Sequence, residues 1–300
     1  MRLDLNLYTV FEAIYNEGNL TKAANTLHIT QPAISHSLAK LREHFDDALF
    51  IRQGHRMLPS PLAERLIVEI RQALHTLKSA HLSSNRFDPA SAKTTFKIGL
   101  RDVLESTCLP PLMSLLQEQA PNVSIISLRH DRKTMEHELA SGELDMVIDV
   151  ALPVTSQLQQ QRVIAERLCV LAKQEHPALK TVLDIDTYIQ QKHVMASYRS
   201  SGMAIEDLEL NRYGLSRNVV LRCQHYYAAS QVVSHSELLL TMPESYARLL
   251  AKDNSQLEVF DFPIQSPSVD VHIYSHTSRE TDPELKWLKE VFMTLALGGT

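Results

Sequence analysis

Apolar residues in the first 59 positions recur at helical spacing, and polar turn residues divide them into three short stretches. The first stretch carries a stripe at positions i, i+3, i+4 and i+7, formed by Leu7, Val10, Phe11 and Ile14. This spacing predicts an amphipathic helix that Asp4 caps and Gly18 ends. A second, short helix is expected over 20–27, where Ala23 and Ala24 permit close approach of a neighbouring helix.

A third helix is expected over 31–45, because Thr30 can cap it and Pro32 is tolerated in its first turn. Its apolar face is formed by Ile34, Leu38, Leu41 and Phe45. Pointing away from that face are Pro32, His36, Ala39 and Lys40, with Gln31, Ser35 and Arg42 on the flanks. Two short helices joined by a tight turn, the second with a polar, small outer face, are typical of a helix-turn-helix that reads the major groove. A three-helix bundle with a solvated polar face fits the same spacing equally well.

The residues after the third helix predict a small hairpin over 49–58 that turns near Gly54. Its Arg52 and Arg56 are suited to contact a phosphate or the minor groove of DNA. Charge does not decide between the two interpretations, because residues 1–60 hold six basic and six acidic side chains.

One long helix is predicted over 61–83, with Ser60 as its cap and Pro61 at its first position. Apolar residues recur along it at alternating spacings of four and three, at Leu66, Ile70, Ala73, Leu77 and Ala80. Such a seam suits the pairing of two chains, which would place two recognition helices about 34 Å apart on one duplex. It suits a helix packed on its own domain equally well. The polar residues of 84–93 predict a hinge.

From Thr94 onward, β-rich runs alternate with amphipathic helices, which is typical of α/β domains. A β-α-β-α-β run is expected, with its elements at 94–100, 102–119, 123–128, 133–141 and 145–150. Its first helix is expected to break at Pro110 and Pro111. A second module is expected over 164–262, with strands near 168–172, 193–196, 219–222 and 238–241. A last strand over 268–275 and a helix over 283–297 complete the pattern.

Composition narrows the class of protein. With 300 residues, 44% hydrophobic and 22% charged, the chain fits a folded globular protein of two or three domains. The formal net charge of −5 disfavours binding to nucleic acid by charge alone. No run approaches the roughly 18 apolar residues that a membrane span needs, and no signal peptide is recognised. Three scattered cysteines without a CxxC pair indicate reduced thiols, so we expect a cytoplasmic protein without a membrane partner.

The run LTKAANTLHITQPAIS at 20–35, followed by Leu38, Leu41-Arg42 and LFIR at 49–52, strongly resembles the LysR-type transcriptional regulators. Features at 87–90, 96–98, 109–112 and 282–288 resemble the subgroup that contains nodulation and aromatic-degradation regulators. The resemblance implies an α/β multidomain protein. Its parts would be a winged helix-turn-helix DNA-binding domain at 1–60, a linker and dimerisation helix at 61–83, a hinge at 84–93, and an effector-binding domain at 94–300. That last domain would be two-lobed and like a periplasmic binding protein, with lobe I at about 94–163 and 267–300 and lobe II at about 164–266.

The family's DNA-contact positions fall on Thr30, Gln31, Pro32, Ser35 and Arg52. Three further residues of the same surface, His36, Lys40 and Arg56, are added as candidate DNA contacts. His36 departs from the small or basic residue expected beside that serine, and a solvated histidine is the alternative.

The resemblance places an effector between the two lobes, and ligands of such sheets bind beyond the carboxyl ends of strands. Three loops qualify, at 100–103, 197–202 and 223–227. The candidate effector-binding residues are Arg101, Asp102, Ser197, Arg199, Ser200, Ser201, His225 and Tyr226. Arg101 and Arg199 suit a carboxylate, although either can equally be a surface or inter-lobe arginine. Ser200 and Ser201 would offer hydroxyl and amide donors at a helix N-terminus.

The sequence lacks the motifs of metal sites, hydrolases and nucleotide-binding loops. Fourteen histidines occur without an HExxH or HxH pattern, so no metal site is expected. Neither a GxSxG elbow nor a GxxxxGK[ST] loop occurs, so no catalytic residue, enzyme activity or cofactor is expected. Cys223 beside the predicted ligand site is a candidate redox sensor, but no second cysteine is near it in sequence.

Two functions from different classes fit these features. The first is a transcription regulator that binds double-stranded operator DNA and a small organic, anionic effector, and that forms homodimers or homotetramers. RNA polymerase would be a further partner if it activates genes. The second is a ligand-binding or enzymatic α/β protein whose N-terminal helices serve oligomerisation only. Specific duplex binding that weakens steeply with salt separates them, and we favour the first.

Overall fold

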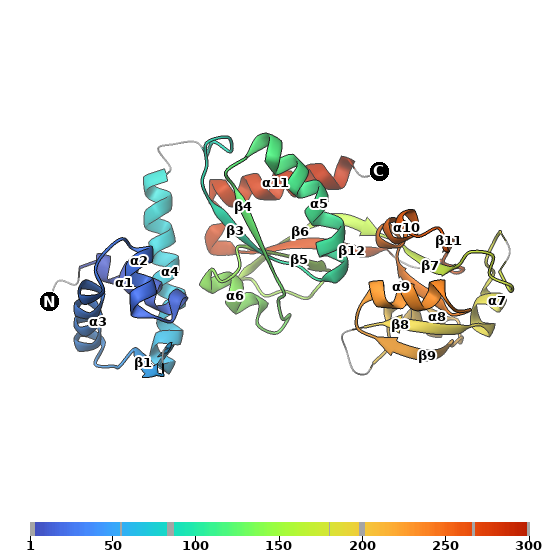
Figure 1. The fold of residues 1–300 in the computed structure, drawn as a ribbon, viewed down its shortest axis with the longest axis horizontal. Coiled ribbons are helices and arrows are strands. Elements are labelled where there is room, and N and C mark those ends of the chain that lie inside the picture. Colours follow the sequence, from blue (N-terminus) through green and yellow to red (C-terminus); the bar gives the residue numbers. More distant parts are fainter. Residues whose placement is uncertain are drawn as a thin grey trace. The chain divides into compact units, whose positions relative to one another are not determined.

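The computed structural model describes residues 4–54, 56–82, 87–179, 181–197, 202–265 and 268–298. The chain divides into two compact units, each described separately below. The N-terminal unit comprises residues 1–88, 131–145 and 275–286, and the core unit comprises residues 89–130, 146–274 and 287–300. Helices and a small hairpin begin the N-terminal unit, and two mixed sheets with helices form most of the rest, as the alternation predicted (Figure 1).

Three helices and a hairpin open the N-terminal unit. They are α1 (Asn6–Glu17), α2 (Leu20–Thr26), α3 (Gln31–Phe45), β1 (Phe50–Gln53) and β2 (Arg56–Pro59). The predicted end of α1 is confirmed, because Gly18 adopts a left-handed φ of 54° and donates its N–H to the carbonyl of Ile14. The carboxylate of Asp4 accepts the N–H of Asn6 at 3.0 Å, but the N-cap of α1 is Leu5, one residue later than predicted, and it makes no side-chain cap bond. The hairpin pairs antiparallel around Gly54.

The apolar faces predicted for α1 and α3 form one core. Its fully buried members include Phe11, Ile14, Ile34 and Leu41, while Phe45 at the end of the α3 stripe is half-buried. The Phe11 and Phe50 rings lie 5.0 Å apart between centroids, so the hairpin is anchored to α1 by aromatic packing.

The long helix α4 (Pro61–Leu82) also packs on this core. The hydroxyl of Ser60 accepts the N–H of Ala63 at 3.2 Å, which confirms the predicted cap. Ala63, Ile67 and Ile70 are buried among the residues of α1 and α3. The predicted seam is therefore divided between two environments: Ile70 is only 5% exposed and belongs to the unit's own core, whereas Leu77 is 52% exposed. The side chain of Ala80 lies outside the described residues.

The first sheet has the strand order β4-β3-β5-β12-β6. These strands are β3 (Thr95–Gly99), β4 (Ser124–Leu128), β5 (Met146–Val150), β6 (Leu158–Glu166) and β12 (Val269–His276). Strand β3 is parallel to β4 and β5, and β12 is antiparallel to β5, so the end of the chain returns to this sheet. The segments between and after these strands form α5 (Asp102–Gln119), α6 (Met135–Ser141), the 3-10 turn η1 (Thr277–Arg279) and α11 (Pro283–Gly298), of which α6 and η1 belong to the N-terminal unit. The predicted β-α-β-α-β run is confirmed.

The second sheet has the order β11-β7-β10-β8-β9. Its strands are β7 (Leu168–Lys173), β8 (Lys192–Ala196), β9 (Asn218–Cys223), β10 (Leu239–Pro243) and β11 (Leu257–Asp261). The helices of this module are α7 (Ile185–Gln190), α8 (Ile205–Arg212), α9 (Tyr226–Ser234) and α10 (Glu244–Asp253). Strands β8, β9 and β10 are parallel, whereas β7 and β11 run antiparallel to their neighbours. The carboxyl ends of the parallel strands are therefore on one edge.

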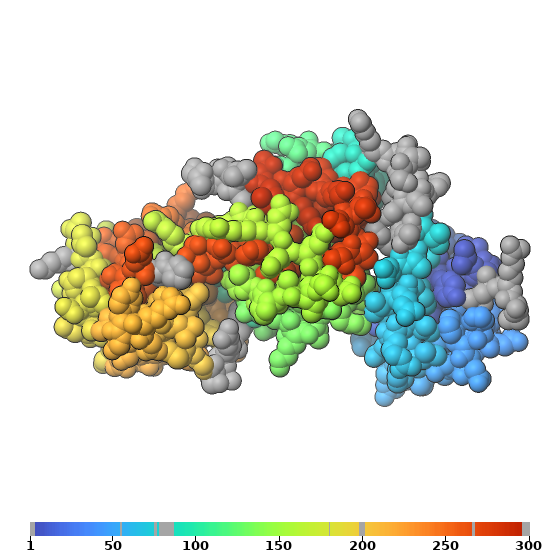
Figure 2. All heavy atoms as spheres, turned by 180° about the vertical axis from the view of Figure 1, so that it is seen from behind, coloured from blue at the N-terminus to red at the C-terminus, as the bar shows by residue number. Residues whose placement is uncertain are grey.

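Three features differ from the sequence prediction. Helix α5 continues through Pro110 and Pro111 instead of breaking, because Leu112 and Leu116 beyond them are buried and tertiary packing outweighs two lost N–H bonds. Strands β6 and β11 were not predicted. Strand β6 is rich in glutamine and only its first residue, Leu158, is buried, so it lacks a clear apolar pattern. On the face in Figure 2 it lies beside β12 and α11, where a hollow is lined by Gln159, Gln160, Gln161, Ile273 and Lys289.

Candidate nucleic-acid interface and ligand site

The predicted reading face of α3 is open to solvent. Thr30, Gln31, Pro32, His36 and Lys40 are exposed, and Ser35 is half-buried. The side chains that α3 buries, Ile34, Leu38 and Leu41, hold this face outward, because they anchor the opposite side of the helix. The face is thus available to a partner that can accommodate a helix.

Gln31 and Ser35 contact one another on this face. The side-chain amide of Gln31 donates to the hydroxyl of Ser35 at 2.9 Å. A glutamine amide has two N–H donors and an oxygen acceptor, so one donor and the oxygen stay available to pair with an adenine edge. The bond restricts the rotamers of Gln31, which reduces the entropy lost when a base is bound.

Helices α2 and α3 are both capped by side chains. The hydroxyl of Thr30 accepts the N–H of Ala33 at 3.4 Å, as predicted, and its own hydrogen stays free to donate. The carboxamide of Asn19 accepts the N–H groups of Thr21 and Lys22 at 2.9 and 3.1 Å, which starts α2. Sequence reasoning missed Asn19, although an asparagine directly before a helical stretch is a recognised cap signal.

The hairpin positions two of the predicted basic residues. Arg52 and Arg56 are exposed, and Nε of Arg52 donates to the carbonyl of Gly54 at 3.2 Å. Arg42, on the flank of α3, donates to the carbonyls of Ala48 and Phe50 at 2.8 and 2.6 Å. Its role is to fix the start of the hairpin against α3.

Two of the three predicted ligand loops meet in the core unit. Asp102, the first residue of α5, places Oδ2 3.4 Å from the N–H of Tyr226, which donates to it. The same oxygen lies 3.5 Å from Nδ1 of His225. Since α5 follows the first sheet and α9 belongs to the second, these contacts join the two modules at the predicted strand ends.

Arg101 lies beside two residues that the sequence did not suggest. Its guanidinium is 4.0 Å from Oδ2 of Asp149, which is itself 3.1 Å from Nε2 of His130. Asp149 and His130 are 2% and 3% exposed. The signal that could have found them is the carboxylate within MVIDV, an otherwise apolar buried strand.

The third loop is described in part. The N–H of Ser197 donates to the carbonyl of Cys223 at 2.8 Å, so its start lies beside the 223–227 loop. Arg199, Ser200 and Ser201 lie outside the described residues. Burial raises the pKa of the Cys223 thiol, which lowers its thiolate fraction and disfavours reactivity. Burial, together with the Glu206 carboxylate, also raises the pKa of Tyr226.

A buried ionic network lies close to Tyr226. Arg217 donates to Glu206 and Asp207 at 2.7 Å each, and its side chain is 1% exposed. The network also includes Tyr188, whose hydroxyl is 2.6 Å from that of Thr241. The carboxylates of Glu206 and Asp207 share the Arg217 guanidinium, and these contacts hold α8 on the second sheet.

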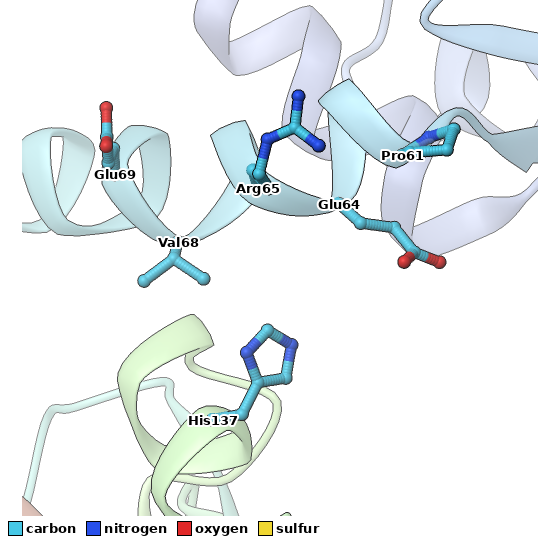
Figure 3. A pocket seen from close by; sticks show the side chains of 6 residues that line it. All are labelled: Pro61, Glu64, Arg65, Val68, Glu69 and His137. Atoms are coloured by element: carbon cyan, nitrogen blue, oxygen red, sulfur yellow. The ribbon is translucent and has the colours of Figure 1, made fainter.

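Among the described residues of the N-terminal unit, α4 lines a hollow of about 160 Å³ near Arg71 and two larger hollows. One of the two larger hollows faces α6: Val68 points toward that helix, His137 points back toward α4, and Arg65 and Glu69 point away (Figure 3). The other is an apolar groove of about 320 Å³, which we call the α4 groove. It is lined by Leu5, Tyr8, Phe45, Leu66, Glu69, Ile70, Ala73, Leu74 and Leu77.

Among the described residues, no three His, Cys, Asp or Glu side chains are grouped in a way that could hold a metal ion. Within the same residues, no helix is both long and apolar enough to cross a membrane.

Comparison with known proteins gives two family matches. Residues 5–64 match the bacterial regulatory helix-turn-helix of the lysR family, and residues 89–296 match the LysR substrate binding domain. The chain is 28% identical to the HTH-type transcriptional activator NagR of Ralstonia, over 98% of this chain and 97% of that one. It is 29% identical to Nodulation protein D 1 of a Bradyrhizobium strain, over 97% and 92%. A crystal structure of a probable transcriptional regulator from Pseudomonas aeruginosa matches with a TM-score of 0.72 and 32% identity, over 98% and 97%.

Proposed function

The chain belongs to the LysR family of bacterial transcriptional regulators, and from this premise we propose which residues read DNA and which bind its effector. Residues 5–64 carry the helix-turn-helix of the family, and residues 89–296 carry its substrate binding domain. We infer that the protein is not an enzyme and acts in the cytoplasm, where its DNA lies.

The single observation that carries the DNA-binding assignment is the outer face of α3. Gln31 and Ser35 read base edges in the major groove, and Thr30, Pro32, His36 and Lys40 contact the neighbouring backbone or bases. Arg52 and Arg56 on the hairpin bind phosphate or reach the minor groove. Arg42 is left out, because its guanidinium is already engaged by two carbonyl groups.

The α4 groove is proposed to receive a second copy of the chain. Ala73 and Leu77, which are exposed, and Leu66, which is half-buried, continue the heptad-like spacing, and two paired helices would place two α3 helices on successive major grooves. Tetramers would then need a further surface. The core unit exposes two candidate groups of large apolar side chains: Met113, Ile126 and Leu128, and Ile205, Leu208 and Tyr213.

The effector is proposed to be a small organic anion held where the strand-end loops meet. Arg101 supplies the charge partner, while Asp102, His225 and Tyr226 bring the two modules together around it. Ser197, Arg199, Ser200 and Ser201 are proposed to line the same site. The two modules can respond to the effector because the loops come from both.

Substitution at Gln31 tests DNA reading. In the full chain, Gln31→Ala should weaken cognate duplex binding by about 1–3 kcal/mol and leave random duplex almost unchanged, because the lost contact is to a base edge. Gln160→Ala, an exposed glutamine of the core unit, is the matched control and should change neither affinity. Fluorescence anisotropy at several salt concentrations measures both. Equal weakening on both duplexes would show that α3 does not read bases.

The proposed effector site at Arg101 is tested on the same full chain. A panel of acetate, succinate, benzoate and phenylacetate is screened by thermal unfolding of wild type, Arg101→Ala and Arg162→Ala. Arg162 has an exposed side chain paired with Asp270, so its loss should leave any stabilisation unchanged. Stabilisation that survives Arg101→Ala places the ligand elsewhere, and no stabilisation by any acid rejects a carboxylate effector.

A further inference from the structure

A buried carboxylate lies directly behind Arg101. Oδ2 of Asp149 is 4.0 Å from the Arg101 guanidinium and 3.1 Å from Nε2 of His130, while Oδ1 accepts the N–H of Val150 at 2.8 Å. The Asp149 side chain is 2% exposed, the His130 side chain is fully buried, and that of Arg101 is 25% exposed. Arg101 is therefore the member of this cluster that a dissolved ligand can reach.

The protonation of His130 is constrained by these neighbours. An ionised carboxylate has no hydrogen to donate, so Nε2 of His130 must carry the hydrogen of this bond. The other ring nitrogen, Nδ1, is buried and has no hydrogen-bond partner among the described residues. Without ligand, one carboxylate and one guanidinium balance each other, and a second positive charge on the buried imidazole would be uncompensated.

We propose that binding of a carboxylate at Arg101 is accompanied by uptake of a proton by His130. This inference rests on the effector site proposed above. A ligand carboxylate beside Arg101 leaves two anions sharing one guanidinium. Protonation of His130 restores the balance, because a nearby anion favours the charged form of an imidazole and water screens little of that attraction in a buried site.

Other titratable groups surround this cluster. Arg129 and Asp131, which flank His130 in the chain, are exposed, so solvent screens them. Asp102 and His225 form a second acid–imidazole pair at 3.5 Å in the same proposed site. The His225 side chain is 54% exposed, so its charge is solvated with or without a ligand.

His272 of β12 lies opposite Asp149 in the sheet register, is half-buried, and has a buried Nδ1 with no hydrogen-bond partner among the described residues. His225 and His272 are therefore rival sources of any proton uptake, and the experiment must separate both from His130.

The direction in which ligand affinity changes with pH follows from the direction of proton transfer. Uptake on binding means that affinity is highest at low pH and falls as pH rises. For one proton the loss reaches about tenfold per pH unit at its steepest.

The test is calorimetric titration of the full chain with benzoate between pH 5.5 and 8.5, in two buffers of different ionisation enthalpy. We expect net uptake approaching one proton per benzoate near neutral pH. His130→Gln keeps an N–H donor toward Asp149 but cannot titrate, so benzoate should still bind, with no uptake. His235→Gln, an exposed histidine at the end of α9, is the matched control and should behave as wild type. Thermal unfolding without ligand verifies that each variant folds.

Three results would overturn the proposal. Uptake that persists in His130→Gln, uptake that disappears in His225→Gln or in His272→Gln, or wild-type binding that does not change with pH each reject His130 as the acceptor while leaving the ligand site intact. Absence of benzoate binding at every pH instead rejects Arg101 as a carboxylate site, and with it the proposed effector site. The failure of this inference is thus distinguishable from the failure of the proposed function.

Discussion

Leu49 shows how single residues fix the junction between α3, the hairpin and α4. Its backbone is left-handed, with a φ of 53°, and its side chain is fully buried. A non-glycine residue in this conformation costs about 1–3 kcal/mol, so other contacts must enforce it. The carboxylate of Asp47 accepts the N–H of Leu49 and the hydroxyl of Ser60, both at 2.6 Å. The N–H of Ser60 in turn donates to the carbonyl of Leu49 at 2.7 Å.

The Asp47 clamp predicts a stability that depends on pH. The Ser60 hydroxyl, followed by the Leu49 N–H, holds the pKa of Asp47 below its ordinary value in the folded chain. Its stabilising contribution is therefore present above the unfolded pKa of about 3.9 and is lost as pH falls through the lower, folded value. Asp47→Asn should lower the midpoint of urea unfolding at pH 7.

The difference between Asp47→Asn and wild type should shrink toward zero as the pH falls below 4. Asp46→Asn is the matched control, because Asp46 is exposed, ends α3 in a left-handed conformation, and asparagine is well tolerated there. Equal losses at pH 3 and pH 7 would show that the charge of Asp47 is not what the clamp requires.

At the scale of elements, α4 passes from a buried to an exposed environment along its length. Ala63, Ile67 and Ile70 pack in the core of the N-terminal unit, while Leu77, seven residues beyond Ile70 on the same side of the helix, lines the α4 groove and is exposed. A charge at Ile70 would be buried without a partner, so Ile70→Glu would unfold the unit and say nothing about pairing of two chains.

Leu77→Glu is the informative change. Because Leu77 is 52% exposed, the variant should keep the wild-type unfolding temperature of the N-terminal unit but lose dimers and cognate DNA binding. Val182→Glu, at a more exposed apolar position of the core unit, should change neither property. Sedimentation velocity and anisotropy measure the two. A dimeric Leu77→Glu protein with normal DNA binding would exclude the α4 groove as the pairing surface.

At the scale of the whole molecule, the proposed function joins a DNA site in one unit to an effector site in the other. An effector can shift DNA affinity only by its differential affinity for two arrangements of the protein, and such coupling is usually about 1–3 kcal/mol. Linkage makes the effect reciprocal. Saturating benzoate should therefore change the Kd for cognate duplex by about 5–150-fold, in either direction.

Reciprocity supplies the check on this coupling. Saturating cognate duplex should change the Kd for benzoate by the same factor, measured by calorimetry on the full chain. In Arg101→Ala both effects should disappear, whereas Arg162→Ala should retain them. Two factors that differ, or benzoate binding with no change in DNA affinity, would contradict coupling between the sites.

The elements of the N-terminal unit were predictable from sequence because their signals are local. The i, i+3, i+4 spacing around Phe11, the cap at Thr30 and the left-handed glycine at Gly18 each act within a few residues, and each is found as predicted. The outward face of α3 followed from the same periodicity. The motif spanning 20–35 further indicated the family to which the chain belongs.

Tertiary structure decided whatever depends on residues far apart in the chain. Helix α5 runs through two prolines because buried leucines hold it, and β6 exists because β12 offers its edge. Ile70 became a core residue because α1 and α3 cover it. His130 and Asp149 are 19 residues apart in the chain. Only the fold of the core unit places Asp149 next to both His130 and Arg101. Periodicity reports which side of an element is buried, but not which distant side chains share that interior, because this depends on how the elements pack.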